Sequence, residues 1–178
     1  MQKKEMDELG RLSKDAFQQA DKMPIVLVLE NVRSMHNVGS VFRTSDAFLV
    51  NKIYLCGYTP KPPHRDIQKT ALGATETVAW EGQENALLCI EKLKKEGYKV
   101  FAVEQAHGST SLEKLKITSS YPIALVFGNE AAGVEASTIA QCDGCIEIPQ
   151  FGTKHSFNIS VSAGIVLWEI YKQMRSAS

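Results

Sequence analysis

Short apolar runs alternate with amphipathic stretches along most of the chain. Residues 25–29 and 122–127 are apolar throughout and rich in β-branched residues and leucine. Unbroken runs of this kind are typical of strands that are buried on both faces of a parallel sheet. The pattern predicts six strands, at residues 25–30, 52–57, 77–80, 98–104, 122–127 and 145–148.

Most of the intervening stretches carry the spacing of apolar positions that an amphipathic helix needs. The predicted helices are residues 2–20, 37–48, 67–72, 83–96, 111–116, 136–141 and 158–174. Strands that alternate with helices indicate an α/β fold. We therefore expect a mostly parallel six-stranded sheet with helices on both faces.

The last predicted helix is apolar on more than one side. Ala163, Val166 and Ile170 fall on one face, while Ile165 and Trp168 fall on another. A helix that is apolar on so many sides must be buried on more than one of them. In a chain of this size the second apolar face favours an interface between subunits.

The composition is that of one ordinary domain. The chain has 178 residues, of which 44% are hydrophobic and 22% are charged, and these values suit a globular fold. We expect residues 23–178 to form the domain and residues 1–22 to form a helical extension. The chain contains no apolar run of membrane-spanning length, and its charged first residues lack the apolar core of a signal peptide, so the expected location is cytoplasmic.

Charge and cysteine content narrow the possible functions. Twenty basic and twenty acidic residues cancel, which argues against broad nucleic-acid binding through net charge but leaves room for a local basic face. Cys142 and Cys145 have the spacing of a metal or redox pair, but no second such pair and no histidine pair accompanies them. We expect these two and Cys56 and Cys89 to be reduced thiols around a core, with no metal site.

Polar residues gather at the ends of predicted strands, where parallel α/β sheets bind their ligands. In the first group Asn37, Ser40 and Arg43 share one side of a predicted helix, although Asn37 is also a suitable cap and Arg43 a simple exposed cation. In the second group Gly128 and Gly133 flank a short loop where the backbone can approach a ligand. A tight turn is the alternative for this loop, which lacks the Lys-Ser/Thr of a P-loop.

The third group lies at the start of the last predicted helix. Lys154, His155, Ser156 and Asn158 fall within five positions there. A helix N-terminus offers free backbone N–H groups and a positive dipole, which suit polar ligands. Alternatively, Ser156 or Asn158 simply caps the helix.

Taken together, the three groups resemble the SpoU-type (TrmH-like) RNA ribose 2′-O-methyltransferases of the SPOUT superfamily. The Asn-x-Gly-x-x-x-Arg motif of that family is matched by Asn37, Gly39 and Arg43, and its Gly-x-Glu-x-x-Gly motif by Gly128, Glu130 and Gly133. The third motif is matched by Ile148, Pro149, Ser156, Asn158 and Ser160, with Phe157 where the family usually has leucine. The similarity covers roughly residues 25–171 and leaves out the N-terminal segment.

The resemblance implies a cofactor, a partner and a topology. Members of this family use S-adenosylmethionine, form homodimers and carry a deep trefoil knot in the C-terminal part of the chain. Residues 103–108, 127–133 and 147–157 would then build the knot and hold the cofactor. By this analogy the backbone of Gly128, Ile148 and Phe157 contacts the cofactor, and Glu104 accepts hydrogen bonds from its ribose.

The resemblance also assigns the chemistry, which is transfer of a methyl group to a ribose 2′-hydroxyl of tRNA or rRNA. Arg43 is the residue implied to activate the hydroxyl, and the residues implied to arrange the site are Asn37, Glu130, Ser156 and Asn158. Moving an arginine pKa from about 12.5 to near 7 would cost roughly 7 kcal/mol. We therefore expect a charged Arg43 that binds phosphate and stabilises the developing alkoxide.

A local basic excess is expected to contact the RNA. Residues 24–75 contain six basic and three acidic side chains, an excess that a phosphate-tracking face needs. An ordinary solvated loop is the alternative. The expected RNA-binding residues are Arg33, His36, Lys61, His64, Arg65 and Lys69.

Three other functions are weaker candidates. A noncatalytic RNA- or cofactor-binding module on the same fold would not need the full polar set. A hydrolase using Ser156 and His155 is disfavoured because adjacent side chains seldom face each other and no Gly-x-Ser-x-Gly turn is present. A nicotinamide-dinucleotide enzyme would need a Gly-x-Gly-x-x-Gly turn, which the chain lacks.

Overall fold

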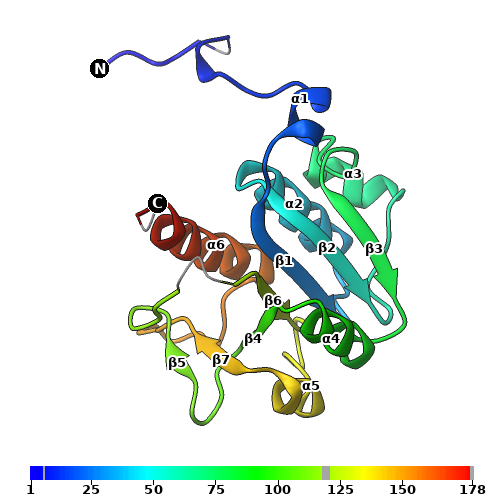
Figure 1. The fold of residues 1–178 in the computed structure, drawn as a ribbon, viewed down its shortest axis with the longest axis vertical. Helices are drawn as coiled ribbons and strands as arrows, with labels where there is room; N and C mark the ends of the chain where they lie inside the picture. Colours follow the sequence, from blue (N-terminus) through cyan, green and yellow to red (C-terminus); the bar gives the residue numbers. More distant parts are fainter. Residues whose placement is uncertain (6, 118–120, 177–178) are drawn as a thin grey trace.

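A single parallel sheet runs through a computed structural model of the chain, which describes residues 1–5, 7–117 and 121–176. The order of the strands across the sheet is β3-β2-β1-β6-β4-β7-β5, and every neighbouring pair is parallel (Figure 1). The strands are β1 (Met23–Glu30), β2 (Val50–Cys56), β3 (Ala79–Gln83), β4 (Lys99–Val103), β5 (Thr110–Ser111), β6 (Ile123–Phe127) and β7 (Gly144–Glu147).

The described part of the chain thus has seven strands, so the predicted number of six is wrong. The additional strand, β5, is a two-residue edge strand that pairs with the end of β7. The helix predicted at residues 111–116 is also wrong, because a turn follows β5 there. Leu112 and Leu115 are buried in the core, so their apolar spacing reflects this turn packing onto the sheet and not a helix.

Helices cover both faces of the sheet, as predicted. The helices are α1 (Lys14–Gln19), α2 (Met35–Ala47), α3 (Arg65–Ala71), α4 (Ala86–Lys95), α5 (Ala136–Gln141) and α6 (Ile159–Ser176), with a 3-10 turn, η1, at Asp7–Leu9. Side chains of α2, α3 and α6 share one apolar core with Leu27 and Leu29 of β1. Side chains of α4 and α5 share the other core with Val26 and Val28. Alternate residues of β1 therefore enter opposite cores, which explains its unbroken apolar sequence.

The predicted helix at residues 2–20 is not continuous. Gly10 has a left-handed φ of +58° and separates η1 from α1, in which Ser13 accepts a hydrogen bond from the amide of Ala16. The first residues extend away from the domain (Figure 1), but Phe17 of α1 is only 4% exposed and belongs to the core. The N-terminal segment is therefore anchored to the domain through α1.

Helix α6 buries one apolar face and leaves the other open. Ala163, Val166 and Ile170 are fully buried, whereas Val161 is 48% and Trp168 55% exposed. Trp168 also packs in an aromatic cluster with Tyr171, whose ring centroid lies 6.1 Å away. No helix within the described residues is long and apolar enough to cross a membrane.

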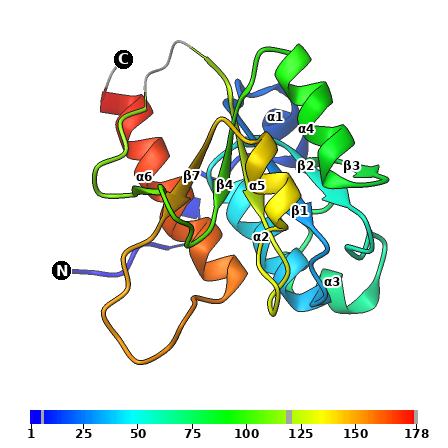
Figure 2. The same cartoon turned by 90° about the horizontal axis from the view of Figure 1, so that it is seen from below.

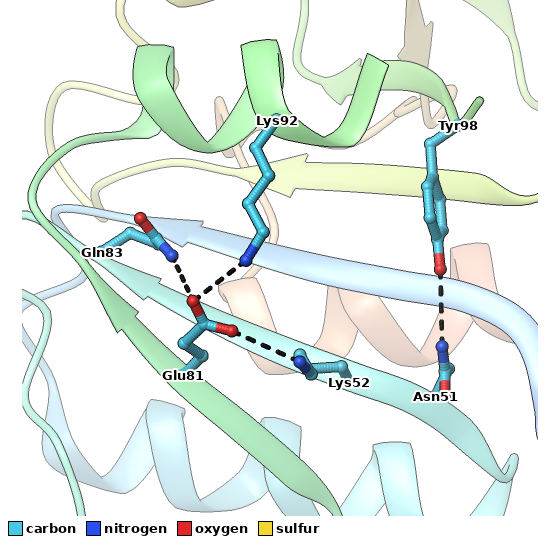
Figure 3. A network of polar contacts seen from close by, with 6 residues as sticks. All are labelled: Asn51, Lys52, Glu81, Gln83, Lys92 and Tyr98. Carbon is cyan, nitrogen blue, oxygen red and sulfur yellow. Dashed lines mark hydrogen bonds and ion pairs between the residues drawn. The ribbon is translucent and has the colours of Figure 1, made fainter. Parts of the chain in front are cut away.

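A charged network covers the edge of the sheet at β3. The Glu81 carboxylate accepts hydrogen bonds from Lys52 of β2, Lys92 of α4 and Gln83 (Figure 3). Because these side chains are about one-third exposed or more, the ion pairs add little to stability. Charges on an edge strand do discourage pairing with the strands of other molecules.

The four cysteines are free thiols. Cys56 and Cys89 are buried, and Cys142 and Cys145 are half-buried. Burial raises the pKa of the Cys142 thiol to about 12, and the neighbouring Cys145 contributes to the increase. A thiol with so high a pKa is a poor nucleophile and a poor metal ligand.

Candidate functional site

The carboxyl ends of β4, β6 and β7 surround a cavity of about 440 Å³. The segments that line it are residues 103–105, 127–133, 148, 150, 155–159 and 162. Figure 2 shows the loop between β7 and α6, in orange, as a long excursion before α6 begins. Because parallel strands end at one edge of the sheet, segments that are far apart in sequence meet here.

Glu130, in the loop after β6, binds the N-terminus of α2. Its Oε2 accepts a hydrogen bond from the Arg33 amide at 2.9 Å, and its Oε1 accepts bonds from the Ser34 amide and from Asn37 Nδ2, each at 2.9 Å. Partial burial raises the pKa of this carboxyl, but the three hydrogen bonds outweigh that effect and leave the pKa below its usual value. Glu130 is therefore an ionised anchor, and its oxygens are too engaged to act as a general base.

A chain of side-chain amides joins the three motif segments. Asn37 donates to Glu130 through Nδ2 and accepts a hydrogen bond from Asn158 Nδ2 at 3.0 Å through Oδ1. Asn158 Oδ1 then accepts from the Ser160 amide at 2.9 Å and from the Ser160 hydroxyl at 2.7 Å. The structure thus brings Asn37, Glu130 and Asn158 together.

These contacts also decide the capping alternatives. Ser34, and not Asn37, caps α2, because Ser34 Oγ accepts a hydrogen bond from the Asn37 amide. The expectation that Asn37 caps a helix beginning at residue 37 is wrong, and its side chain is free to reach across to the other loops. Asn158 has both roles, since it accepts from the first turn of α6 and donates to Asn37.

Asn129 holds the Glu130 loop in shape. Its Oδ1 accepts hydrogen bonds from the amides of Ala131 and Ala132, and its Nδ2 donates to the Asn31 carbonyl at 2.8 Å. Sequence reasoning missed this residue, although Asn129 lies directly between the matched Gly128 and Glu130. The tendency of an asparagine to accept a hydrogen bond from the backbone two residues further on, in an Asx turn, could have indicated its role.

Glu30 is a second missed residue, at the end of β1. It is 3% exposed and accepts hydrogen bonds from the Glu135 amide at 2.9 Å and the Thr138 hydroxyl at 2.5 Å. Burial raises the pKa of the Glu30 carboxyl despite these bonds. Glu30 therefore ties β1 to the N-terminus of α5, which follows the Glu130 loop.

The glycines of the second motif are required by close packing. A Cβ at Gly128 would lie 2.1 Å from the backbone of Gly133, and a Cβ at Gly133 would lie 2.2 Å from Glu104 Oε2. The Glu104 oxygens accept hydrogen bonds from the amides of Gln105 at 2.8 Å and Val134 at 3.0 Å. Glu104 thus connects two walls of the cavity, and its contact with a cofactor ribose remains a prediction.

The loop after β7 forms the open side of the cavity. Ile148, Ser156 and Phe157 line the cavity, and the last two are exposed. The loop is held by Gln105, whose Nε2 donates to the His155 carbonyl at 2.5 Å. The lining combines apolar side chains with polar ones, and its two carboxylates, Glu104 and Glu130, already accept hydrogen bonds from backbone amides.

Arg43 lies outside this cavity. It is on α2, about 9 Å along the helix axis from Asn37 at 1.5 Å per residue, and it lines a second cavity of about 400 Å³ together with Lys14, Asp46 and residues 71–74, 76 and 77. Within one chain, the structure does not bring Arg43 to the cavity that Glu130 and Asn158 line.

The predicted RNA-binding residues are all exposed. Arg33 and His36 lie at the N-terminus of α2, while Arg65 and Lys69 belong to α3. His64 caps α3 by accepting a hydrogen bond from the Asp66 amide, Lys69 pairs with Asp66 at 2.7 Å, and the aliphatic chain of Lys61 lies against Gly82. The side chains of Arg33, His36 and Arg65 make no hydrogen bond or ion pair with the described residues.

Comparison with solved structures defines the fold. A crystal structure titled as an A. aeolicus TrmH/SpoU tRNA modifying enzyme has a TM-score of 0.80 and 26% identity, and the match covers 92% of this chain and 81% of that one. An AdoMet-bound rRNA methyltransferase from Sinorhizobium meliloti has a TM-score of 0.78 and 27% identity, with coverage of 91% and 61%. The chain therefore has the α/β fold of TrmH/SpoU proteins.

The sequence comparison gives the family. The family model described as the SpoU rRNA Methylase family matches residues 24–168, so this chain belongs to that family. A similar protein from Neisseria meningitidis serogroup B, named 23S rRNA (guanosine-2′-O-)-methyltransferase RlmB, is 32% identical over 89% of this chain and 62% of its own length. A tRNA (guanosine(18)-2′-O)-methyltransferase from Borreliella burgdorferi is 27% identical over 86% of this chain and 69% of its own length. The chain spans about six-tenths of the first curated relatives that it matches.

Proposed function

We propose that this protein transfers a methyl group from S-adenosylmethionine to a ribose 2′-hydroxyl of tRNA or rRNA. The observation that carries the proposal is the hydrogen-bonded chain from Glu130 through Asn37 to Asn158 at the edge of a cavity. These hydrogen bonds join the three segments that match the family motifs. The names of the relatives support the reaction, because they describe 2′-O-methyltransferases of rRNA and tRNA.

The 440 Å³ cavity suits the cofactor in size and chemistry. Ligand cavities are usually about 300–1,000 Å³, and they combine apolar walls with a few placed polar groups. Here Phe127, Ile148 and Ile159 supply apolar walls, and the backbone of Gly128, Ile148 and Phe157 would hold the cofactor. Bound S-adenosylmethionine supplies the methyl group, and the chain supplies its position and excludes water.

A second subunit would complete the site. Arg43 lies outside the cavity of its own chain, and α6 leaves Val161 and Trp168 exposed. Association of two chains through this face of α6 would bury the apolar side chains and bring the Arg43 of one chain toward the cavity of the other. We further propose that the loops at residues 103–108, 127–133 and 147–157 form a trefoil knot, and the support is that β7 lies in the sheet between β4 and β5, which both precede it in the chain.

Arg43 would act in its charged form. The proposed role is to bind a phosphate of the RNA and to stabilise the alkoxide as the hydroxyl proton passes to water or to phosphate. Glu130 would not accept that proton, because its carboxylate already holds three hydrogen-bond donors. Asn37, Asn158 and Ser156 would arrange the site around the reacting ribose.

Two measurements test the proposal. Titration calorimetry should detect binding of S-adenosylmethionine, and mass mapping of tRNA and rRNA should reveal ribose methylation that depends on the protein. Arg43→Ala should abolish turnover and leave the affinity for the cofactor unchanged. Lys95→Ala, which removes an exposed cation from α4, is the matched control and should behave as wild type.

The outcomes separate the alternatives. Retained turnover in Arg43→Ala would reject the role of that residue. A wild-type protein that binds S-adenosylmethionine and RNA without transferring a methyl group would instead be a noncatalytic binding module on the same fold. A protein that does not bind the cofactor would contradict the proposed class of enzyme.

A further inference from the structure

The second cavity, which we call the Arg43 groove, has a wall that lies outside the span of the family match. Its lining residues are Lys14, Arg43, Asp46, Ala71, Leu72, Gly73, Ala74, Glu76 and Thr77. Lys14 comes from α1, whereas the family match begins at residue 24. The groove is therefore a feature that the N-terminal segment of this chain helps to build.

Helix α1 is held in a fixed place beside the groove. Phe17 is buried in the core, and the Lys22 ammonium lies 4.3 Å from the centroid of the Phe17 ring and donates to the carbonyls of Phe17 and Ala20. At the first turn of α1, Lys14 Nζ lies 2.9 Å from Glu76 Oε2. These contacts place the Lys14 ammonium at the rim of the groove.

Among the charged side chains of the groove, Arg43 is the one without a partner in the described part of the chain. Asp46 Oδ2 accepts a hydrogen bond from the Thr77 hydroxyl at 2.5 Å, and Glu76 pairs with Lys14. The Lys14 side chain is 52% exposed, and an exposed ion pair contributes little energy, so its ammonium can also contact a ligand. The Arg43 guanidinium is exposed and makes no hydrogen bond or ion pair with the described residues. A guanidinium offers a planar array of donors that matches a phosphate group.

Leu72 gives the groove an apolar surface in an unusual conformation. It follows α3 with a left-handed φ of +49°, and its side chain is 65% exposed. Glycine is the usual residue at such a helix end, because a side chain is strained there. A strained leucine that buries little of its own surface points to a ligand that covers it.

We propose that the Arg43 groove binds an RNA nucleotide next to the one that is methylated, with its phosphate between Arg43 and Lys14 and its base against Leu72. This inference rests on the proposed function for the identity of the ligand as RNA. A nucleotide has the anionic group and the flat apolar surface that these side chains would contact. The N-terminal segment is then part of the surface that selects the substrate.

The principal test replaces Leu72 by glycine. Leu72→Gly removes the side chain and relieves the backbone strain, so the thermal midpoint should stay the same or rise. The KM for RNA should rise about fivefold, because the base loses its apolar contact, while kcat and the affinity for S-adenosylmethionine stay unchanged. Leu88→Ala is the control, since Leu88 is 48% exposed on α4 on the other face of the sheet.

A second variant tests the phosphate contact. Lys14→Gln should weaken binding of a fluorescein-labelled single-stranded RNA and of bulk tRNA, and the slope of log affinity against log salt should fall by about 0.7 to 0.9. Lys95→Gln is the control, because Lys95 is also an exposed lysine paired with a glutamate, Glu91, at 2.6 Å.

The results separate this inference from the proposed function. RNA binding is measured whether or not the wild-type protein transfers a methyl group, so a failure of the reaction leaves the binding test intact. Leu72→Gly and Lys14→Gln variants that bind RNA as tightly as their controls would overturn the inference. Variants in which the RNA affinity and the thermal midpoint fall together would also overturn the inference, since these residues would then act by stabilising the fold.

Discussion

The contacts of Glu130 lead to a quantitative prediction for Glu130→Gln. The wild-type carboxylate accepts three hydrogen bonds from the N-terminal turn of α2. In the best orientation of the glutamine, its oxygen keeps the Ser34 amide and Asn37 Nδ2, and its NH₂ group faces the Arg33 amide. One bond to a charged group is lost, and two become bonds between neutral groups.

The cost follows from the strength of these bonds. A hydrogen bond to a charged group contributes about 1.5–3 kcal/mol and a neutral one about 1 kcal/mol. Because Glu130 is partly exposed, water screens these interactions, and we expect a net destabilisation of about 2 kcal/mol. For a chain of this size that corresponds to a fall of about 4–8 °C in the thermal midpoint.

Urea unfolding as a function of pH is the assay. The pKa of Glu130 is lowered in the folded protein. The ionised carboxylate therefore stabilises the fold at pH values above the pKa of the unfolded chain, about 4.3, and this stabilisation is lost as the pH falls through the lower pKa of the folded protein. The stability difference between wild type and Glu130→Gln should therefore be full at pH 7 and shrink in acid.

A neighbouring glutamate provides the control. The Glu135 carboxylate accepts one hydrogen bond, from Asn31 Nδ2 at 2.8 Å, and Glu135→Gln keeps an oxygen for it. The free energy of unfolding of the Glu135→Gln variant should fall by less than about 1 kcal/mol. Equal stabilities of the Glu130→Gln and Glu135→Gln variants would refute the assignment of Glu130 as the anchor of α2.

Two further predictions concern a buried carboxyl and the open face of α6. Burial raises the pKa of Glu30 in the folded state, so its contribution to stability is present below the unfolded value and is lost as the pH rises through the folded value. The stability of wild type relative to Glu30→Gln should fall over that pH range, and a flat difference would contradict the shift. Trp168→Glu places a charge on the exposed apolar face of α6, and light scattering should show a monomer that folds but has lost turnover. A dimeric Trp168→Glu variant would exclude this face as the interface.

The sequence predicted most strands because their signal is local. Residues 25–29 of β1 and all residues of β6 are apolar because both faces of each strand are covered, and the sequence shows this burial directly. β5 has only two residues and exists because it pairs with β7, so no periodicity marks it. The helix boundary at Gly10 was missed for a different reason, since helical spacing continues past a residue whose backbone is left-handed.

The residues of the site also divide into those that a sequence pattern could reveal and those that it could not. The motif residues Asn37, Glu130 and Asn158 were found because the resemblance supplied their spacing. Asn129 and Glu30 were not found, because their role depends on which loops the topology brings together, as when Glu30 meets the amide of Glu135 across a separation of 105 residues. Patterns within one segment carry no information on such contacts.

The position of Arg43 follows from the anchoring of α2 as a unit. Glu130 and Asn37 fix the first turn of this helix, and Val38, Val41 and Phe42 are fully buried against the sheet. A helix held at one end and along one face moves as a rigid body, so contacts at the rim of the 440 Å³ cavity help to place the guanidinium about two turns further on. Loss of the Glu130 anchor should therefore displace Arg43 without touching it. In a dimer, the anchor in one chain would govern the cation presented to the cavity of the other, so catalysis should be more sensitive to Glu130→Gln than cofactor binding is.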